Sequence, residues 1–379
     1  MTDPRVERLA GLIVDYSFGL EEGHVLRIDG SAVAEPLAVA LYRAALAAGG
    51  HPYTNLALEG LPEILVEEGS DEQLSYISPV QWHEIEHLDA LVTIWSETNT
   101  RSFTHADERK HGALIKSLRR LANRRWERIT AGEMRWCGTL YPTHAHAQDA
   151  DMSLAEYEDF VYSACHADEP DPAAHWREVS SALRRRAAAL GSVEELRFLG
   201  PDTDLRVGVA GRTWVAADGR YNMPDGEVFT SPVETETEGE IRFTFPAVFH
   251  GRQVEDVRLR FADGAVVGAE AATGERYLRE LIALDGGAAV PGEIAFGLNY
   301  EIDRFTRNIL LDEKIGGTIH LALGSGFRQT GGRNSSALHW DLICDLRADG
   351  EVYADGELIW KAGFFREEES SVAVAGHSG

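Results

Sequence analysis

The chain has 379 residues, and 44% of them are hydrophobic. A chain of this length is longer than one ordinary hydrophobic core usually holds, so we expect two domains. Its 62 acidic residues against 36 basic ones give a net charge of −26, and such a surface repels nucleic acid and anionic membranes. The N-terminal stretch MTDPRVERLAGLIVDYSFGL lacks the layout of a secretory signal, and no apolar run reaches membrane-spanning length. We therefore expect a cytoplasmic protein.

The first half alternates short apolar runs with helical patterns. The runs 24–30, 51–58 and 88–97 predict strands, whereas the patterns 34–50, 61–69, 107–126 and 177–190 predict helices. Alternating strands and helices are typical of a sheet covered by helices. Residues 1–195 are therefore predicted to form an α/β N-terminal domain.

The second half changes to short β-rich runs separated by Gly, Pro and Asp turns. Examples are TWVAAD, EIRFTFPAVF, VEDVRLRFADGAVVGAEA and EVYADGELIWKAGFF, and residues 275–286 carry the clearest helical pattern. Residues 196–370 are therefore predicted to form a strand-rich α+β C-terminal domain. The polar residues 371–379 are predicted to be a disordered tail.

His83-Glu84-Ile85-Glu86-His87 matches the H-E-x-x-H pattern of zinc metalloproteases. Ser78 is a suitable N-cap and Pro79 a suitable first residue, so we expect a short helix over 79–87 with both histidines on one face. The segment passes at once into the β-rich run LDALVTIW, however, and no third ligand follows it. We interpret this match as a solvated surface helix.

Other motifs in the chain give little support for a metal, disulfide or nucleotide site. Cys137, Cys165 and Cys344 lie far apart and form no C-x-x-C pair, which argues against a zinc ribbon or a disulfide framework. His144 and His146 lie in a turn-rich segment, and we interpret them as ordinary surface histidines. The turn RIDGSAVAEP lacks G-x-G-x-x-G, so nucleotide binding is poorly supported.

Four stretches of the second half place metal-type side chains just after tight turns, within otherwise apolar strands. They are NMPDGEVFT (222–230), PGEIAFG (291–297), GGTIHLALG (316–324) and NSSALHWD (334–341), and their candidate ligands are Glu227, Glu293, His320, His339 and Asp341. Residues i and i+2 of a strand project from the same face, so His339 and Asp341 can bind one site together.

A metal cluster explains these side chains economically, because burying carboxylates without a cation is costly. Five ligands with mixed nitrogen and oxygen donors suit two divalent ions better than one. Two such ions about 3.5–4 Å apart can activate a water, stabilise a tetrahedral intermediate and hold a free amine. The ions are expected to be Zn, Co, Mn or Mg.

At these four stretches the chain resembles the thermophilic metalloaminopeptidases, the family that contains aminopeptidase T and aminopeptidase S. Residues 135–162 resemble a further family stretch, so the likeness spans most of the chain. The resemblance implies that the metal ligands are Glu227, Glu293, His320, His339 and Asp341, and that Glu293 is also the glutamate implicated in catalysis. It further implies a distinct C-terminal metal domain, a homodimer and removal of N-terminal residues from peptides.

One position departs from the family pattern. Seven residues after His320, where the family has a tyrosine implicated in catalysis, this chain has Phe327, which cannot donate a hydrogen bond to an oxyanion. Tyr300 or Arg328 could supply a replacement donor. The leading hypothesis is a dimetal aminopeptidase acting through a metal-activated water. The alternative is a metal-binding homologue with weakened or lost peptidase activity that binds peptides or a partner.

Overall fold

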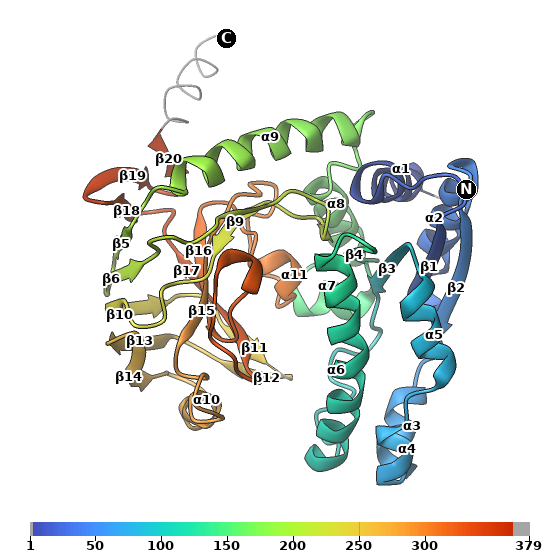
Figure 1. Cartoon of the computed structure of the whole chain (residues 1–379), viewed down its shortest axis with the longest axis horizontal. Helices are drawn as coiled ribbons and strands as arrows, with labels where there is room; N and C mark the ends of the chain where they lie inside the picture. The colour runs from blue at the N-terminus through green and yellow to red at the C-terminus, as the bar shows by residue number, and fades with distance from the viewer. Residues whose placement is uncertain (1–2, 250, 367–379) are drawn as a thin grey trace. The chain divides into compact units, whose positions relative to one another are not determined.

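The computed structural model describes residues 3–249 and 251–366, and Figure 1 draws its elements. The chain divides into two compact units. Unit 1 holds Met1–Arg177 and Gly219–Pro224, and unit 2 holds Glu178–Asp218 and Asp225–Gly379. The predicted tail, 371–379, lies outside the described residues. Among the described helices, none has the length and apolar content needed to cross a membrane.

Unit 1 contains a parallel sheet of five strands in the order β2-β1-β3-β4-β8. The strands are β1 Val25–Ser31, β2 His51–Ala57, β3 Ala90–Trp95, β4 Arg135–Leu140 and β8 Asn222–Met223. The helices are α1 Pro4–Leu12, α2 Glu35–Ala47, α3 Leu61–Glu68, α4 Asp71–Ser75, α5 Pro79–His87, α6 Glu108–Thr130, α7 His144–Asp149 and α8 Leu154–Ala164. A π-helical turn, Ile13–Phe18, follows α1. Figure 1 also shows helix α9, Pro172–Leu190. Its residues up to Arg177 belong to unit 1 and those from Glu178 onward belong to unit 2.

The parallel sheet of unit 1 confirms the α/β prediction, and burial on both of its faces explains the sequence pattern of its central strand. Leu91 and Val92 are adjacent in the central strand β3 and point to opposite faces, yet both are fully buried. Central strands of parallel sheets are covered on both faces, which explains why the sequence shows a continuous apolar run here rather than an alternating one.

Strand β8 brings a distant part of the chain into this sheet. Asn222 and Met223 pair with Gly138 and Thr139 of β4, and the Thr139 hydroxyl donates to the Met223 carbonyl over 2.7 Å. Residues beyond the predicted boundary at 195/196 thus complete the first sheet. The two-domain division with that boundary stays a prediction.

Unit 2 is built from antiparallel sheets, as predicted for a strand-rich domain. The larger has the order β14-β13-β10-β6-β5-β18-β19-β20, the second has the order β17-β16-β15-β9-β7, and β11 pairs with β12. The strands are β5 Glu195–Gly200, β6 Thr203–Gly208, β7 Val215–Ala217, β9 Glu227–Thr230, β10 Thr237–Phe243, β11 Ala247–Phe249, β12 Arg252–Val254, β13 Val257–Ala262, β14 Ala265–Glu270, β15 Pro291–Gly297, β16 Thr318–Gly324, β17 His339–Asp345, β18 Glu351–Ala354, β19 Glu357–Lys361 and β20 Phe364–Phe365. Two helices, α10 Glu275–Ile282 and α11 Ile309–Asp312, interrupt the strands.

One hydrophobic core joins the two large sheets of unit 2. Phe198 of β5 and Phe296 of β15 are fully buried in it, with ring centroids 6.1 Å apart. Trp360 of β19 and Phe365 of β20 contact the same Phe296 ring, at centroid distances of 5.3 Å and 5.2 Å. Phe296 is therefore an aromatic contact point between the sheets.

Replacing Phe296 by alanine is expected to lower the free energy of unfolding by about 3–5 kcal/mol, because it leaves a cavity in this packed core. Urea unfolding followed by tryptophan fluorescence would measure the change. The exposed Leu284 (52% accessible) is the matched control, and Leu284→Ala should change the free energy by less than about 0.5 kcal/mol. Equal losses for the two variants would contradict this account of the core.

Candidate metal centre

The five candidate ligands lie on neighbouring strands of one sheet, in the order β17-β16-β15-β9. Glu227 begins β9, Glu293 lies in β15, His320 lies in β16, and His339 and Asp341 lie in β17. Glu293 and Asp341 both pair with Ala322 of β16, and directly paired residues point to one face. His320 lies two residues before Ala322 and shares that face.

Small residues separate the candidate ligands on this face. Gly297 pairs with Glu227, Ala295 with His320, and Gly324 with His339. Larger side chains at these positions would fill the space between the charged groups. The opposite face carries Ile294, Phe296, Ile319, Leu321, Leu323 and Leu342, all in the hydrophobic core. The alternation of the strands therefore divides the sheet into an apolar face and a face for polar chemistry.

The ligand atoms form two groups that share one carboxylate. Atoms of Glu227, Glu293 and His320 lie within 4.8 Å of one another, and so do atoms of Glu293, His339 and Asp341. The His320 Nε2 atom is 3.5 Å from Glu227 Oε2 and 3.6 Å from Glu293 Oε1. The His339 Nε2 atom is 3.3 Å from Glu293 Oε2 and 3.7 Å from Asp341 Oδ1. Glu293 thus lies between the two histidines.

Backbone carbonyls orient both imidazoles. The Nδ1 atom of His320 is 2.9 Å from the Glu313 carbonyl, and the Nδ1 atom of His339 is 2.9 Å from the Ser325 carbonyl. Each carbonyl accepts a hydrogen bond from Nδ1, which leaves Nε2 directed at the carboxylates. Metal-binding histidines are commonly held in this way, with the second ring nitrogen fixed by a carbonyl.

The pKa values of the site reflect this arrangement. Burial alone would raise the pKa of Glu293, but hydrogen bonds from His320 and His339 lower it to about 2. Burial alone would likewise lower the pKa of each histidine, yet the neighbouring carboxylates raise both values to about 10. Without a metal, the two imidazoles are therefore cations that offset part of the carboxylate charge.

Two further residues join the site, and the sequence analysis missed both. Glu313 groups with His320 and Asp341 within 4.8 Å, which makes it a sixth candidate ligand. The fully buried Lys314 forms an ion pair with Glu313, and its Nζ lies 3.9 Å from Glu227 Oε1. Burial alone would lower the pKa of Lys314, but these carboxylates raise it. The run Asp-Glu-Lys before Gly316 resembles a solvated turn, so only the scarcity of lysine could have singled it out.

The residues present fit divalent cations. Glu227 Oε2 and Asp341 Oδ1 are buried oxygens that have no hydrogen-bond partner among the described residues. Burial raises the pKa of Glu227 well above its usual range, and a cation beside this carboxylate would favour its charged form. Imidazole nitrogens mixed with carboxylate oxygens are typical ligands of zinc and manganese. The ligand roles of the five residues remain predictions.

Phe327 lies at this site, in the loop after β16. Its ring contacts the rings of His339 and Phe229 edge-on, with centroids 5.2 Å and 5.3 Å away. Tyr300, one suggested replacement donor, gives its hydroxyl hydrogen to the Gly363 carbonyl over 2.9 Å and stacks on Phe364. Its hydroxyl is therefore already engaged. Arg328, the other suggestion, is exposed immediately beside Phe327.

The H-E-x-x-H match forms the predicted helix, α5, with Ser78 as its N-cap. The His83 and His87 rings stack at 4.0 Å, and the His87 Nδ1 atom is 2.7 Å from the His83 carbonyl. Glu84 pairs with Arg27, and Glu86 with Arg124. Within the described residues, neither histidine joins a group of three metal-type ligands. This observation agrees with the interpretation of α5 as a surface helix.

The two histidines of α7 differ from each other. His144 is exposed, whereas His146 is buried and its Nε2 is 3.0 Å from Glu97 Oε2. The prediction of a surface residue is therefore wrong for His146, because the packing of α7 turns this side chain inward. The three cysteines are buried and free of disulfides.

Comparisons with known proteins bear on the whole chain. Residues 2–365 match the family described as thermophilic metalloprotease (M29). The chain is 30% identical to aminopeptidase T of Thermus thermophilus over 61% of its own length and 62% of that relative. It is 27% identical to aminopeptidase 2 of Geobacillus stearothermophilus over 95% of its length and 97% of the relative. The match thus spans about three fifths of the first relative and nearly all of the second.

Two solved structures share the fold. Wild-type AmpT from Thermus thermophilus superposes with a TM-score of 0.83 at 23% identity, covering 96% of this chain and 99% of the other. The 2,5-dihydroxypyridine dioxygenase from Pseudomonas putida KT2440 has a TM-score of 0.59 at 14% identity, covering 97% and 98%. At these identities the likeness concerns the fold alone. The site residues must therefore carry any argument about chemistry.

Binding of divalent metal to the metal-free protein at pH 7 is expected to release protons, because the pKa values of His320 and His339 are about 10 and metal ligation requires neutral imidazole. Affinity should therefore weaken as the pH falls. Calorimetric titration in buffers of different ionisation enthalpy would count the protons. His339→Gln should reduce the release by about one proton, and an unchanged proton count would argue against the role of His339.

Proposed function

Because the chain belongs to the thermophilic metalloprotease (M29) family, we propose that it is a metal-dependent aminopeptidase that removes N-terminal residues from peptides. The aminopeptidase names of its relatives support this activity. The observation that carries the proposal is the pair of ligand groups that share Glu293 on one face of the sheet. Two groups joined by a common carboxylate suit a pair of divalent ions.

In this proposal Glu227 and His320 would hold one ion, His339 and Asp341 would hold the other, and Glu293 would contribute to both ligand groups. Divalent ions bound there supply a Lewis acid for the scissile carbonyl and lower the pKa of a water. Zinc, cobalt, manganese and magnesium all remain candidates, since the donor set is mixed. The donor set itself, rather than any single residue, determines which ions bind.

The protein's own side chains have three tasks. Glu293 would contribute its carboxylate to both ligand groups, or would hold a proton there during the reaction. The carbonyls of Glu313 and Ser325 keep the two imidazoles in place through their Nδ1 atoms. The acidic chain, with its net charge of −26, attracts the protonated amino terminus of a peptide.

The proposal also includes the oligomeric state, the location and the binding partner of the protein. A homodimer is in keeping with the family resemblance. A cytoplasmic location is in keeping with the acidic composition, which favours neither nucleic acid nor anionic membranes as partners. The natural partner in this proposal is a peptide substrate, and the enzyme's preference among N-terminal residues is broad rather than sharp.

Glu293→Gln is expected to lower hydrolysis of aminoacyl-p-nitroanilides and short peptides by about 100-fold or more, because it removes the shared carboxylate and its proton-carrying capacity. Activity would be measured in molar salt with zinc, cobalt, manganese or magnesium, with and without a chelator. The wild type should require metal and release N-terminal residues.

His83→Ala is the matched control for that experiment. The variant removes a histidine of α5, which the proposal leaves outside the site, so its activity should equal that of the wild type. Loss of activity in His83→Ala with retention in Glu293→Gln would reverse the assignment and favour the H-E-x-x-H helix instead.

Phe327 is the observation that favours the second candidate function, a homologue that binds metal and peptides with weakened or lost hydrolysis. The ring edge beside His339 offers no hydrogen to a developing oxyanion. A peptidase with this residue must obtain that donor elsewhere, and the exposed Arg328 is the nearest cation in sequence.

Phe327→Tyr discriminates between the two candidate functions. If hydrolysis has been lost, the added hydroxyl is expected to raise kcat by about 100-fold or more, since that is the usual worth of one oxyanion donor. If the wild type is already an efficient aminopeptidase, the change in kcat should stay below about tenfold. Steady-state kinetics with equal metal loading would measure the effect.

A further inference from the structure

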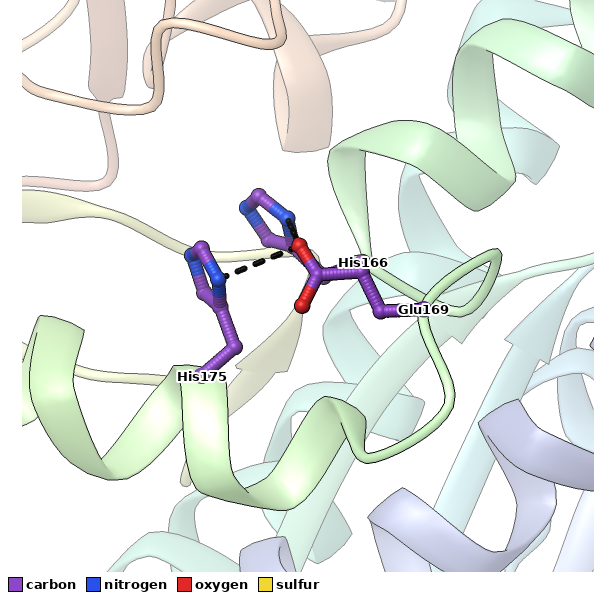
Figure 2. Close-up of side chains that lie close together, drawn as sticks. All are labelled: His166, Glu169 and His175. Atoms are coloured by element: carbon purple, nitrogen blue, oxygen red, sulfur yellow. Dashed lines mark hydrogen bonds and ion pairs between the residues drawn. The ribbon is translucent and has the colours of Figure 1, made fainter.

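A second group of metal-type side chains lies in unit 1, away from the ligands on β9 to β17 in the sequence. His166 follows the end of α8, Glu169 lies in the loop that leads to α9, and His175 lies in the first turn of α9. Figure 2 shows the Glu169 carboxylate beside both imidazole rings, with the same carboxylate oxygen joined to both rings. The proposed peptidase chemistry makes no use of these residues.

The distances in this group fit a metal ion. Glu169 Oε1 is 3.0 Å from His166 Nδ1 and 3.2 Å from His175 Nδ1, and one atom from each residue lies within 4.8 Å of the others. Ligand atoms of a tetrahedral zinc, each ~2.0–2.2 Å from the ion, lie ~3.4 Å from one another. The two imidazole–carboxylate separations are therefore close to those of a zinc site.

One of the two rings must rotate for both to bind the same ion. They stack with centroids 3.4 Å apart and planes 21° from parallel. Rotation of one imidazole about its Cβ–Cγ bond would turn its Nδ1 lone pair out of the stacked arrangement and toward the Nδ1 atom of the other ring, and this torsion is broad in histidine. The side chains of all three residues are partly buried, and Glu169 is the most exposed of them at 41%.

The backbone around the group is held in place on both sides. The buried Trp176 donates its indole hydrogen to the Cys165 carbonyl over 2.9 Å, which ties the residue after His175 to the residue before His166. The Tyr16 hydroxyl donates to the Trp176 carbonyl over 3.1 Å. Three acids and no lysine or arginine occur between residues 163 and 176. Within this segment the acidic residues outnumber the basic ones, although Arg8 donates to the Ala167 carbonyl and Arg177 follows Trp176.

We propose that His166, Glu169 and His175 bind one divalent transition-metal ion, with zinc as the preferred metal, at a site separate from the proposed peptidase centre. Two imidazoles and a carboxylate are ligands that zinc accepts, with water in the fourth position. The ion joins the end of α8 to the start of α9. Its role is structural, since it holds the first turn of a helix whose later residues belong to unit 2.

Zinc content of the full-length protein tests this site without reference to turnover. Wild type and His166→Gln/His175→Gln, equilibrated with zinc in a chelating buffer, would be compared by plasma mass spectrometry. We expect one zinc ion fewer per chain in the double variant. Glu169→Gln keeps a hydrogen-bond acceptor but removes the negative charge, so it should weaken zinc binding. This single variant tests the site if the double variant folds poorly.

His51→Gln is the matched control, because His51 is an exposed histidine of β2 outside every ligand group of the described residues. Amide hydrogen exchange in the first turn of α9 should slow with zinc in the wild type and in this control, but not in the double variant. Equal zinc content in all variants would overturn the proposal and leave a hydrogen-bonded His-Glu-His group only. Absence of peptidase activity would not alter the zinc count.

Discussion

The mutual repulsion of buried carboxylates on one face of the β17-β16-β15-β9 sheet is the constraint on which the rest of unit 2 depends. Glu227, Glu293 and Asp341 share a small volume, and each would be expensive to ionise there without a cation. The metal-free protein meets this requirement with two imidazolium groups and the buried Lys314. A metal ion that binds through His320 and His339 must therefore displace their protons.

The other face of the same sheet supplies the rigidity that such a cluster needs. Strand residues alternate between the faces, so the ligand-bearing positions are interleaved with Ile294, Phe296 and Leu321 of the core. A shift of any strand by one residue would exchange the two sets and bury charges in the apolar core. Packing therefore fixes the register, and the register fixes the geometry of the candidate ligands.

The sequence predicted the features of the fold and of the candidate site that depend on local residue patterns. Alternation of strands and helices indicated the α/β sheet, and the turn-bounded apolar strands singled out the residues that meet on one face. Glu313 and Lys314 escaped notice, because their burial follows from tertiary packing and their sequence context resembles a solvated run. The two-residue strand β8 is too short for a periodic signal. The pairing of Glu169 with two histidines likewise depends on how α8 and α9 meet.

Strand β8 also has a consequence for how the chain matures during synthesis. The ribosome releases β1 to β4 first, yet the sheet of unit 1 lacks its last strand until Asn222 and Met223 emerge. By then β5, β6 and β7, which belong to the strand-rich unit, have already left the exit tunnel. The β4 edge stays open during that interval, as a surface on which a nascent chain is prone to pair wrongly. Assembly of the two units is thus interleaved in time rather than sequential.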